Sequence, residues 1–305
     1  MSAESVDEVI VALDLSATAI TAGLVTMRGE VIDRDETPID HHLQGEALFS
    51  EVVRLVDAQM ERARDHHMAR CVAMGIGCAG PVAPDLEAVS PSDIPAWREF
   101  PLRGRLAATT SLPVFGDLDA KALALAEGWL GAAQGKDCFM AMVVGSSITG
   151  GIVLNGQLLD GAGGAAGHVG HVIVEPNGHR CPCGSRGCLE AEASSTAIAA
   201  LTGRTVAEPT YDTMQRAGRM VGRAAASVCN LLDLDLVVVG GPVAVGFGAT
   251  FFNSAQEALD EHATLRNSRG ARITPVRLGD RGPLVGAAAI GVRGVVRRRR
   301  AARFR

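Results

Sequence analysis

The sequence predicts an α/β fold made of two similar lobes, each built around a mixed sheet. Short apolar segments rich in β-branched residues alternate with amphipathic helical stretches, which is the pattern of α/β proteins. The order strand, turn, strand, strand, helix, strand occurs near the beginning of the chain and recurs in a looser form after residue 137. A chain of 305 residues is long enough for two such lobes, each with its own core.

The first lobe is predicted to cover residues 1–117. A tight turn at Arg28 and Gly29 separates its second and third strands, and a long proline-containing loop through Trp97 follows its fourth. Its predicted elements are strands at 8–15, 20–27 and 29–39, a helix at 46–66 with apolar residues at helical spacing, and a buried strand at 71–77.

The second lobe is predicted to cover residues 118–282. A hairpin turn is expected at Asn155 and Gly156. The predicted elements are helices at 120–131, 211–232 and 248–262, and strands at 139–145, 149–154, 234–241 and 271–279. A last helix, at about 283–305, is expected to pack back on the first lobe.

Composition narrows the classes of protein. Apolar residues make up 47% and charged residues 21%, as in globular proteins. No secretory signal and no run of 18 apolar residues is found, so a cytoplasmic protein without a membrane span is expected. A net charge of −5, 4% aromatic residues and the lack of an N-terminal helix-turn-helix module argue against binding to nucleic acid. Six arginines after residue 296 are expected to be exposed to solvent or to contact acidic partners.

Three of the seven cysteines lie within the stretch HRCPCGSRGCLE, which indicates a metal site. Cys181, Cys183 and Cys188, with His171 ten residues before the first, supply the four nitrogen and sulfur ligands of a closed tetrahedral zinc site. Gly184 and Gly187 would let the backbone turn back toward the metal. The alternative is three buried cysteines and a core histidine.

Three turns have the small residues and hydroxyls that favour contact with phosphate. They are DLSAT at 14–18, GSSITGG at 145–151 and VVVGGP at 237–242, and the first two are equally compatible with ordinary hairpins, the third with a strand end. The candidate nucleotide-binding residues in them are Asp14, Ser16, Thr18, Gly145, Ser146, Ser147, Gly240 and Gly241.

Asp119 is the candidate general base. It follows the strand segment PVFG and begins a helix, where the helix dipole favours its ionised form. An aspartate at this place is also typical of a helix N-cap.

Several segments resemble the ROK family of repressors, uncharacterised frames and sugar kinases, in the family's order and over essentially the whole chain. These segments are GIGCAGPV, SPSDIPAW, PVFGDLDAKALALAEGWLGA, GGIVLNGQLLDGAGGAAGHVGH, CPCGSRGCLEAEAS and VVVGGPV. The resemblance implies a two-lobed, actin-like (ribonuclease H-like) sugar-kinase fold, with ATP and Mg²⁺ between the lobes and a structural Zn²⁺ that braces the sugar-binding loop. It also implies a homodimer or homotetramer.

The resemblance further implies roles for individual residues. His171, Cys181, Cys183 and Cys188 match the family's zinc ligands. Asp119 matches the catalytic aspartate, which takes the proton from the sugar's 6-hydroxyl during phosphoryl transfer. Glu190 matches a carboxylate that accepts hydrogen bonds from sugar hydroxyls.

The departures from the family lie at ligand-binding positions. The first turn lacks both glycines and the lysine of D-x-G-G-T-K, and Ser147 and Thr149 replace glycines in the second, which would strain the backbone if those positions need φ > 0. In the sugar pocket, Leu118 and Asp93 each stand at a position where the family has an asparagine. His168 replaces a glutamate, and the resulting G-H-x-G-H resembles bacterial N-acetylmannosamine kinases.

Two functions follow from this pattern. The first is an ATP-dependent kinase acting on the 6-hydroxyl of glucose, N-acetylglucosamine or N-acetylmannosamine, with activity put in question by the altered turns. The alternative is a catalytically weakened ROK protein that senses sugar or regulates another process.

Overall fold

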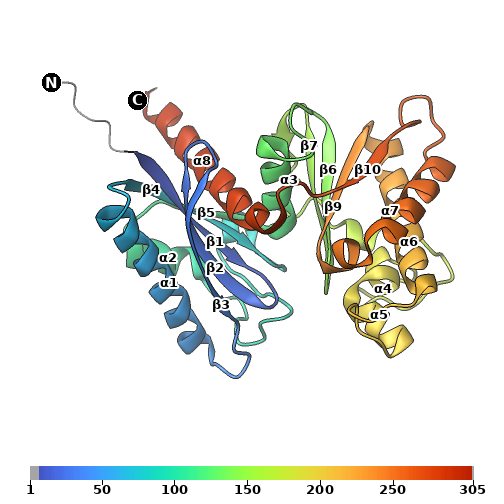
Figure 1. Cartoon of the computed structure of the whole chain (residues 1–305), viewed down its shortest axis with the longest axis horizontal. Helices are drawn as coiled ribbons and strands as arrows, with labels where there is room; N and C mark the ends of the chain where they lie inside the picture. The colour runs from blue at the N-terminus through green and yellow to red at the C-terminus, as the bar shows by residue number, and fades with distance from the viewer. Residues whose placement is uncertain (1–6, 304–305) are drawn as a thin grey trace. The chain divides into compact units, whose positions relative to one another are not determined.

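The computed structural model describes residues 7–303 and divides the chain into two compact units. Of the described residues, the first unit contains 7–129 and 279–303, and the second contains 130–278 (Figure 1). The boundary lies at residue 129 rather than at the expected 117. The reason is that helix α3 (Asp119–Leu130) packs its Ala122 against the glycines Gly77 and Gly286 of the first unit.

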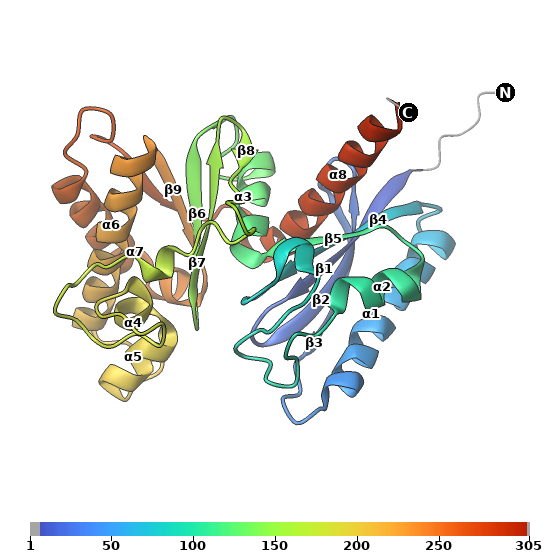
Figure 2. The same cartoon turned by 180° about the vertical axis from the view of Figure 1, so that it is seen from behind.

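The first unit is a five-stranded mixed sheet with helices on both faces (Figures 1 and 2). The sheet order is β3-β2-β1-β4-β5, in which β2 is antiparallel to β1 and β3, while β1, β4 and β5 are parallel. Its other elements are α1 (Gly45–Asp65), α2 (Leu102–Thr110), α8 (Gly282–Arg303) and the short helices η1 (Pro84–Leu86) and η3 (Gly279–Arg281). The strands are β1 (Glu8–Leu15), β2 (Ala19–Thr26), β3 (Val31–Pro38), β4 (Arg70–Cys78) and β5 (Val114–Leu118).

Successive side chains of β1 point to opposite faces of the sheet, so they contribute to two separate cores. Val9, Val11 and Leu13 pack with the apolar face of α1, whereas Ile10 and Ala12 pack with α8. Helix α8 approaches the sheet closely, because a Cβ on Gly75 of β4 would lie 1.9 Å from the Ala287 carbonyl oxygen. The last helix therefore covers the second face of the first sheet, as expected.

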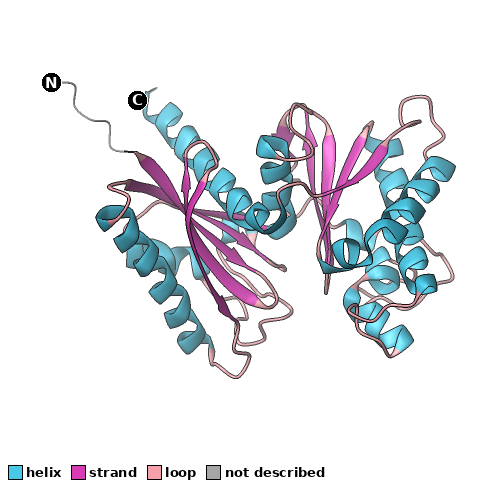
Figure 3. Ribbon diagram, viewed as in Figure 1, coloured by secondary structure: helices cyan, strands magenta, loops and turns pink. Residues whose placement is uncertain are grey.

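The second unit repeats the strand order and strand directions of the first (Figure 3). Its sheet order is β10-β9-β6-β7-β8, with β6, β7 and β8 antiparallel and with β6, β9 and β10 parallel. The strands are β6 (Phe139–Val144), β7 (Ile148–Leu154), β8 (Gln157–Leu158), β9 (Leu236–Gly240) and β10 (Arg272–Pro275). The helices are η2 (Val169–His171), α4 (Leu189–Ala193), α5 (Ser195–Thr202), α6 (Tyr211–Leu232) and α7 (Pro242–His262).

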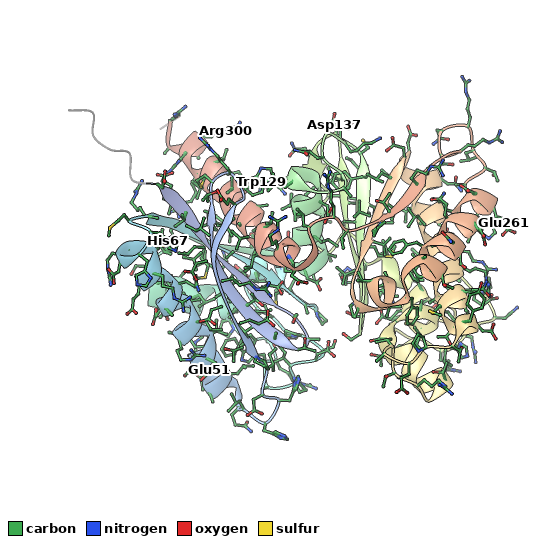
Figure 4. The ribbon with its side chains drawn as sticks, in the orientation of Figure 1. Glu51, His67, Trp129, Asp137, Glu261 and Arg300 are labelled. Atoms are coloured by element: carbon green, nitrogen blue, oxygen red, sulfur yellow. The ribbon has the colours of Figure 1, made fainter. Side chains whose placement is uncertain are left out.

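The pattern predictions locate most elements to within a few residues, and the differences are local. Helix α7 begins at Pro242 rather than 248, because the structure continues it across a kink at Gly248 (φ 56°, ψ −139°). Helices α2, α4 and α5 are additional to those predicted, because they are shorter than the window of about 11–18 residues in which a helical period can be recognised. The arginine run forms the outer end of α8, where Arg300 is exposed (Figure 4), and Arg305 lies outside the described residues.

No helix of residues 7–303 combines the length and the apolar character needed to cross a membrane.

Candidate functional site

The strand-end site (Asp14, Cys78 and Asp119) lies at one edge of the first sheet. Strands β1, β4 and β5 are parallel neighbours, and their register pairs Leu15 with Cys78 and Cys78 with Leu118. The carboxyl ends of the three strands therefore meet, which is the edge where open α/β sheets bind ligands.

The electrostatics of the strand-end site follow from its burial and its two carboxylates. Burial, together with the charges of Asp119 and Glu36, raises the pKa of Asp14 to about 7, against an opposing effect of Arg34. Burial, with the charges of Asp119 and Asp14, also raises the pKa of the Cys78 thiol well above its ordinary value. Cys78 is therefore a protonated, unreactive neighbour, whereas Asp14 titrates near neutral pH.

Asp119 begins helix α3, as its sequence position predicts. Its Oδ1 accepts a hydrogen bond from the Ala120 amide at 2.7 Å, so the carboxylate lies at the positive end of the helix dipole. This bond comes from the next residue along the chain, whereas an N-cap side chain accepts from the amide two or three positions further on. The role of Asp119 as general base stays a prediction.

Leu118 and Asp93 lie in different surroundings. Leu118 is 2% exposed, and a Cβ on Gly80 would lie 2.8 Å from its Cδ2, so the leucine fills the space beside that glycine. Asp93 is partly exposed in the loop that leads to Trp97, and the indole Nε1 of Trp97 donates to the Gly45 carbonyl at 3.0 Å. The loop that carries Asp93 is thus fastened to the start of α1.

The first small-residue turn closes without glycine. The Ser16 hydroxyl accepts hydrogen bonds from the amides of Thr18 and Ala19, at 3.3 and 3.0 Å, and donates to the Ala19 carbonyl. The hydroxyl of Ser16 is therefore used within the hairpin, while Thr18 is exposed.

The second turn lies beside the start of α7. Gly145 is adjacent to Pro242, and the carbonyls of Gly145 and Ser146 accept from the Ser195 amide (2.7 Å) and the Thr196 hydroxyl (3.0 Å). Neither Ser147 nor Thr149 has a positive φ, so the backbone strain considered from the sequence does not arise.

Gly240 and Gly241 end β9 and introduce the same helix. Gly241 has a φ of 92°, and a Cβ there would lie 2.5 Å from the Val144 carbonyl oxygen, so only glycine fits. The second and third turns therefore converge at the N-terminus of α7, where free amides favour an anion.

The metal loop (residues 171–188) brings its four predicted ligands together. Atoms of His171, Cys181, Cys183 and Cys188 all lie within 4.8 Å of one another. The His171 Nδ1 to Cys181 Sγ distance and the Cys183 Sγ to Cys188 Sγ distance are both 3.7 Å. Zinc–sulfur bonds of about 2.3 Å in a tetrahedron separate two sulfurs by about 3.8 Å, so the side chains fit zinc.

Glycine and burial shape the metal loop. Gly184 and Gly187 have φ values of 96° and 68°, and a Cβ on Gly187 would lie 1.6 Å from the Glu175 carbonyl oxygen. Burial, and to a lesser degree the nearby His168, lowers the pKa of His171, which favours the neutral imidazole that binds metal.

Glu190 and His168 flank the metal ligands in the chain. The Glu190 Oε2 accepts from the Ile148 amide at 2.6 Å, and the His168 Nδ1 lies 2.7 Å from the Ala165 carbonyl oxygen. Because a carbonyl only accepts, this contact places a proton on Nδ1 and leaves Nε2 of neutral His168 as an acceptor.

A set of polar residues beside the metal loop was missed by the sequence analysis. Glu192 is fully buried and contacts His179 of the metal loop and Arg216 of α6. The only signal in the sequence was a second glutamate in the otherwise small and apolar stretch LEAEA, two residues after Glu190.

Comparison with known proteins identifies the family. The model of the ROK family matches residues 10–293. A glucokinase of Halalkalibacterium halodurans is 30% identical to this chain, over 92% of this chain and 94% of the glucokinase. An N-acetylmannosamine kinase of Yersinia pseudotuberculosis is 32% identical, over 78% of this chain and 84% of the kinase. A solved ROK glucokinase of Streptomyces griseus, in complex with glucose and AMPPNP, is 26% identical with a TM-score of 0.78, over 94% of this chain and 100% of that one. The chain therefore belongs to the ROK family and has the actin-like fold of its sugar kinases.

Proposed function

We propose that the protein is an ATP-dependent sugar kinase that phosphorylates the 6-hydroxyl of a hexose or an N-acylhexosamine. The observation that carries this proposal is the strand-end site, in which Asp119 begins α3 beside Asp14. Glucokinase and N-acetylmannosamine kinase relatives that align over most of the chain support it, and they suggest glucose and N-acetylmannosamine as substrates. N-acetylglucosamine is a further candidate from the sequence resemblance.

In the proposed reaction, Asp119 accepts the proton of the 6-hydroxyl while the hydroxyl oxygen attacks the γ-phosphorus of ATP. The bond from that phosphorus to the oxygen bridging the β- and γ-phosphates breaks, and ADP leaves. A positioned base of this kind contributes about 10²-fold to 10⁴-fold in rate. Glu190 and the free Nε2 of His168 accept hydrogen bonds from sugar hydroxyls. Asp93 and Leu118 border the sugar, with the leucine supplying an apolar surface in place of an amide.

The proposed nucleotide contacts come from the three small-residue turns. Asp14 offers a carboxylate for the Mg²⁺ that accompanies ATP, because Mg²⁺ prefers oxygen ligands, with Ser16 and Thr18 beside it. Gly145, Ser146 and Ser147, together with Gly240 and Gly241, would face the phosphates and the nucleoside with backbone amides and little side-chain bulk. When bound there, Mg²⁺ would supply positive charge to balance the charge on the transferred phosphoryl group.

Zinc would have a structural role. His171, Cys181, Cys183 and Cys188 form a complete set of four ligands, which leaves no open position for a reacting group. The ion would hold the metal loop in the form that presents Glu190 and His168.

The test is ATP consumption by zinc-replete protein with glucose, N-acetylglucosamine and N-acetylmannosamine. Turnover is expected with at least one sugar, and the product should be the 6-phosphate. The absence of turnover with every sugar would refute the kinase proposal.

A second candidate is a sugar-sensing ROK protein with weakened catalysis. It is favoured by the Ser16 hydroxyl, which is engaged within the hairpin, and by the buried Leu118 at a position where the family has an amide. This candidate predicts that sugar raises the melting temperature while ATP with Mg²⁺ leaves it unchanged. Saturable, Mg²⁺-dependent ATP binding would contradict it.

We further propose a homodimer or homotetramer that does not bind DNA. Sedimentation measures the assembly, and a sequence-specific, salt-sensitive complex with DNA would contradict the second part.

A further inference from the structure

Glu192 is a fully buried carboxylate with several hydrogen-bond donors. Its Oε1 accepts from the His179 amide at 2.6 Å, and its Oε2 lies 3.0 Å from His179 Nδ1. Arg216 Nη2 also donates to Oε2, while Nη1 of the same arginine donates to the Glu192 backbone carbonyl at 2.8 Å. One arginine thus binds both the side chain and the backbone of α4.

These donors keep the buried carboxylate ionised. Burial by itself raises the pKa of Glu192, but the hydrogen bonds from Arg216 and His179 outweigh that effect and hold the pKa below its ordinary range. A buried charge is tolerated only when it is paired and hydrogen-bonded in this way. The arrangement is therefore specific for a carboxylate at this position.

The contacts of Glu192 with Arg216 and His179 join three segments that are separate in the sequence. Glu192 belongs to the short helix α4, Arg216 to α6, and His179 to the metal loop between two of the metal ligands. The loop approaches the carboxylate so closely that a Cβ on Gly178 would lie 2.1 Å from Glu192 Oε1.

Helix α6 holds the metal loop at a second place. Arg223 lies two helical turns after Arg216, on the same face of α6. Its Nη1 donates to the Val174 carbonyl at 3.1 Å and to Glu175 Oε2 at 3.0 Å. Arg223 therefore binds the metal loop directly at Val174 and Glu175. Arg216 of the same helix reaches the loop through Glu192, which contacts His179.

Glu190 is fastened to the same pair through the backbone. It lies two residues before Glu192 in a helix of only five residues, so a shift of Glu192 moves Glu190 with it. The hydrogen bond from the Ile148 amide to Glu190 Oε2 reports where that carboxylate lies.

We propose that Glu192 and Arg216 are positioning residues, whose ion pair holds α4 and the metal loop on α6 and thereby sets the position of Glu190. This ion pair does not involve the metal, and it holds the loop in addition to the metal. Its consequence for sugar binding rests on the proposed kinase function, whereas its consequence for the position of Glu190 does not.

Hydrogen exchange tests the positioning role without any substrate. In Arg216→Gln, amides of peptides covering residues 146–149 and 176–190 should exchange faster by ~10-fold or more, because at least one charge-assisted hydrogen bond is lost. The matched control is Arg219→Gln, which changes an exposed arginine on the same helix and should leave exchange as in the wild type. Unchanged exchange at the Ile148 amide in a folded Arg216→Gln protein would overturn the proposal.

Kinetics and metal analysis separate positioning from general damage. Arg216→Gln should raise the KM for sugar by ~10-fold, in the range seen for residues that orient a site, with the KM for ATP and the zinc content unchanged. Arg216→Lys keeps the positive charge, so its KM for sugar should lie between those of the wild type and Arg216→Gln. The lysine variant also provides the test if the glutamine variant does not fold. Loss of zinc, or equal rises in both KM values, would overturn the proposal. Wild-type protein that turns over no sugar would refute the kinase function, and hydrogen exchange would still decide the positioning role.

Discussion

The strand-end site of the first unit and the metal loop of the second are held in different ways. Asp14, Cys78 and Asp119 lie at the ends of neighbouring strands or at the first residue of a helix, so the sheet itself fixes their backbones. Glu190 and His168 lie on either side of a loop with little regular structure. Four predicted metal ligands lie together in this loop, Arg223 of α6 binds it directly, and Arg216 binds Glu192, which contacts it.

The two sites therefore differ in the interactions that determine their stability. The sheet positions the carboxylates of the first unit without extra contacts, but it brings Asp14 and Asp119 together under poor hydration, and the pKa of Asp14 rises to about 7. The metal loop of the second unit has little regular structure, so its form depends on side-chain contacts and on the predicted metal ligands. Changes in the first unit should therefore alter chemistry and pH dependence, whereas changes in the second should alter sugar affinity.

The largest effect is expected from Asp119→Asn. The amide cannot accept the sugar's proton, so kcat should fall by at least ~10²-fold. Steady-state kinetics with the best sugar measures the change. ATP binding and melting temperature should stay near the wild-type values, and a variant that retains full kcat would remove Asp119 from the mechanism.

Asp14→Asn should change how stability depends on pH. A pKa raised by folding gives stability that is complete below the ordinary pKa of 3.8 and is lost as pH rises through about 7. The asparagine lacks this loss, so the variant should be more stable than the wild type at pH 8, by at most about 4 kcal/mol because the side chain is partly exposed.

Urea unfolding at pH 4, 6 and 8 without nucleotide measures this prediction. The difference between variant and wild type should grow with pH over this range. A constant difference would show that Asp14 does not titrate near neutral pH.

Cys183→Ser tests the dependence of the second unit on its metal. The wild type should contain one zinc per chain by elemental analysis, and the variant should lose it. Sugar binding should weaken by ~10-fold to 100-fold, whereas nucleotide binding should hardly change, because the ion braces Glu190 and His168.

The same variant should remain folded. Cys181 and Cys188 pack only in a small cluster with Ala191, apart from the main core of the second unit. A cooperative thermal transition is therefore expected, unlike the behaviour of a zinc finger. Metal-free protein that binds sugar as tightly as the metal-loaded form would show another purpose for the cysteines.

The smallest effect is expected from His168→Ala. It removes one proposed hydrogen bond from the free Nε2 to the sugar, which corresponds to ~3-fold to 10-fold in the kcat/KM for the best sugar. The KM for ATP should be unchanged. A loss as large as that of Cys183→Ser would mean that His168 supports the metal loop rather than the sugar.

Much of this protein was determined locally in the sequence. The helix at residues 211–232 follows from its strong helical period, and the opening strands from their β-branched runs and the turn at Gly29. The clustering of His171, Cys181, Cys183 and Cys188 was also predictable, because their spacing within 18 residues and the glycines between them limit how the loop can close. These features depend on neighbours in the chain, so a pattern is enough to predict them.

Other features were decided only by contacts between distant segments. The pKa of Asp14 depends on Asp119, which lies 105 positions later, and the burial of Leu118 depends on Gly80. The pairing of Glu192 with Arg216 depends on how α4 packs against α6. No spacing rule connects such residues, because burial and electrostatic coupling are properties of the packed structure and not of the chain order.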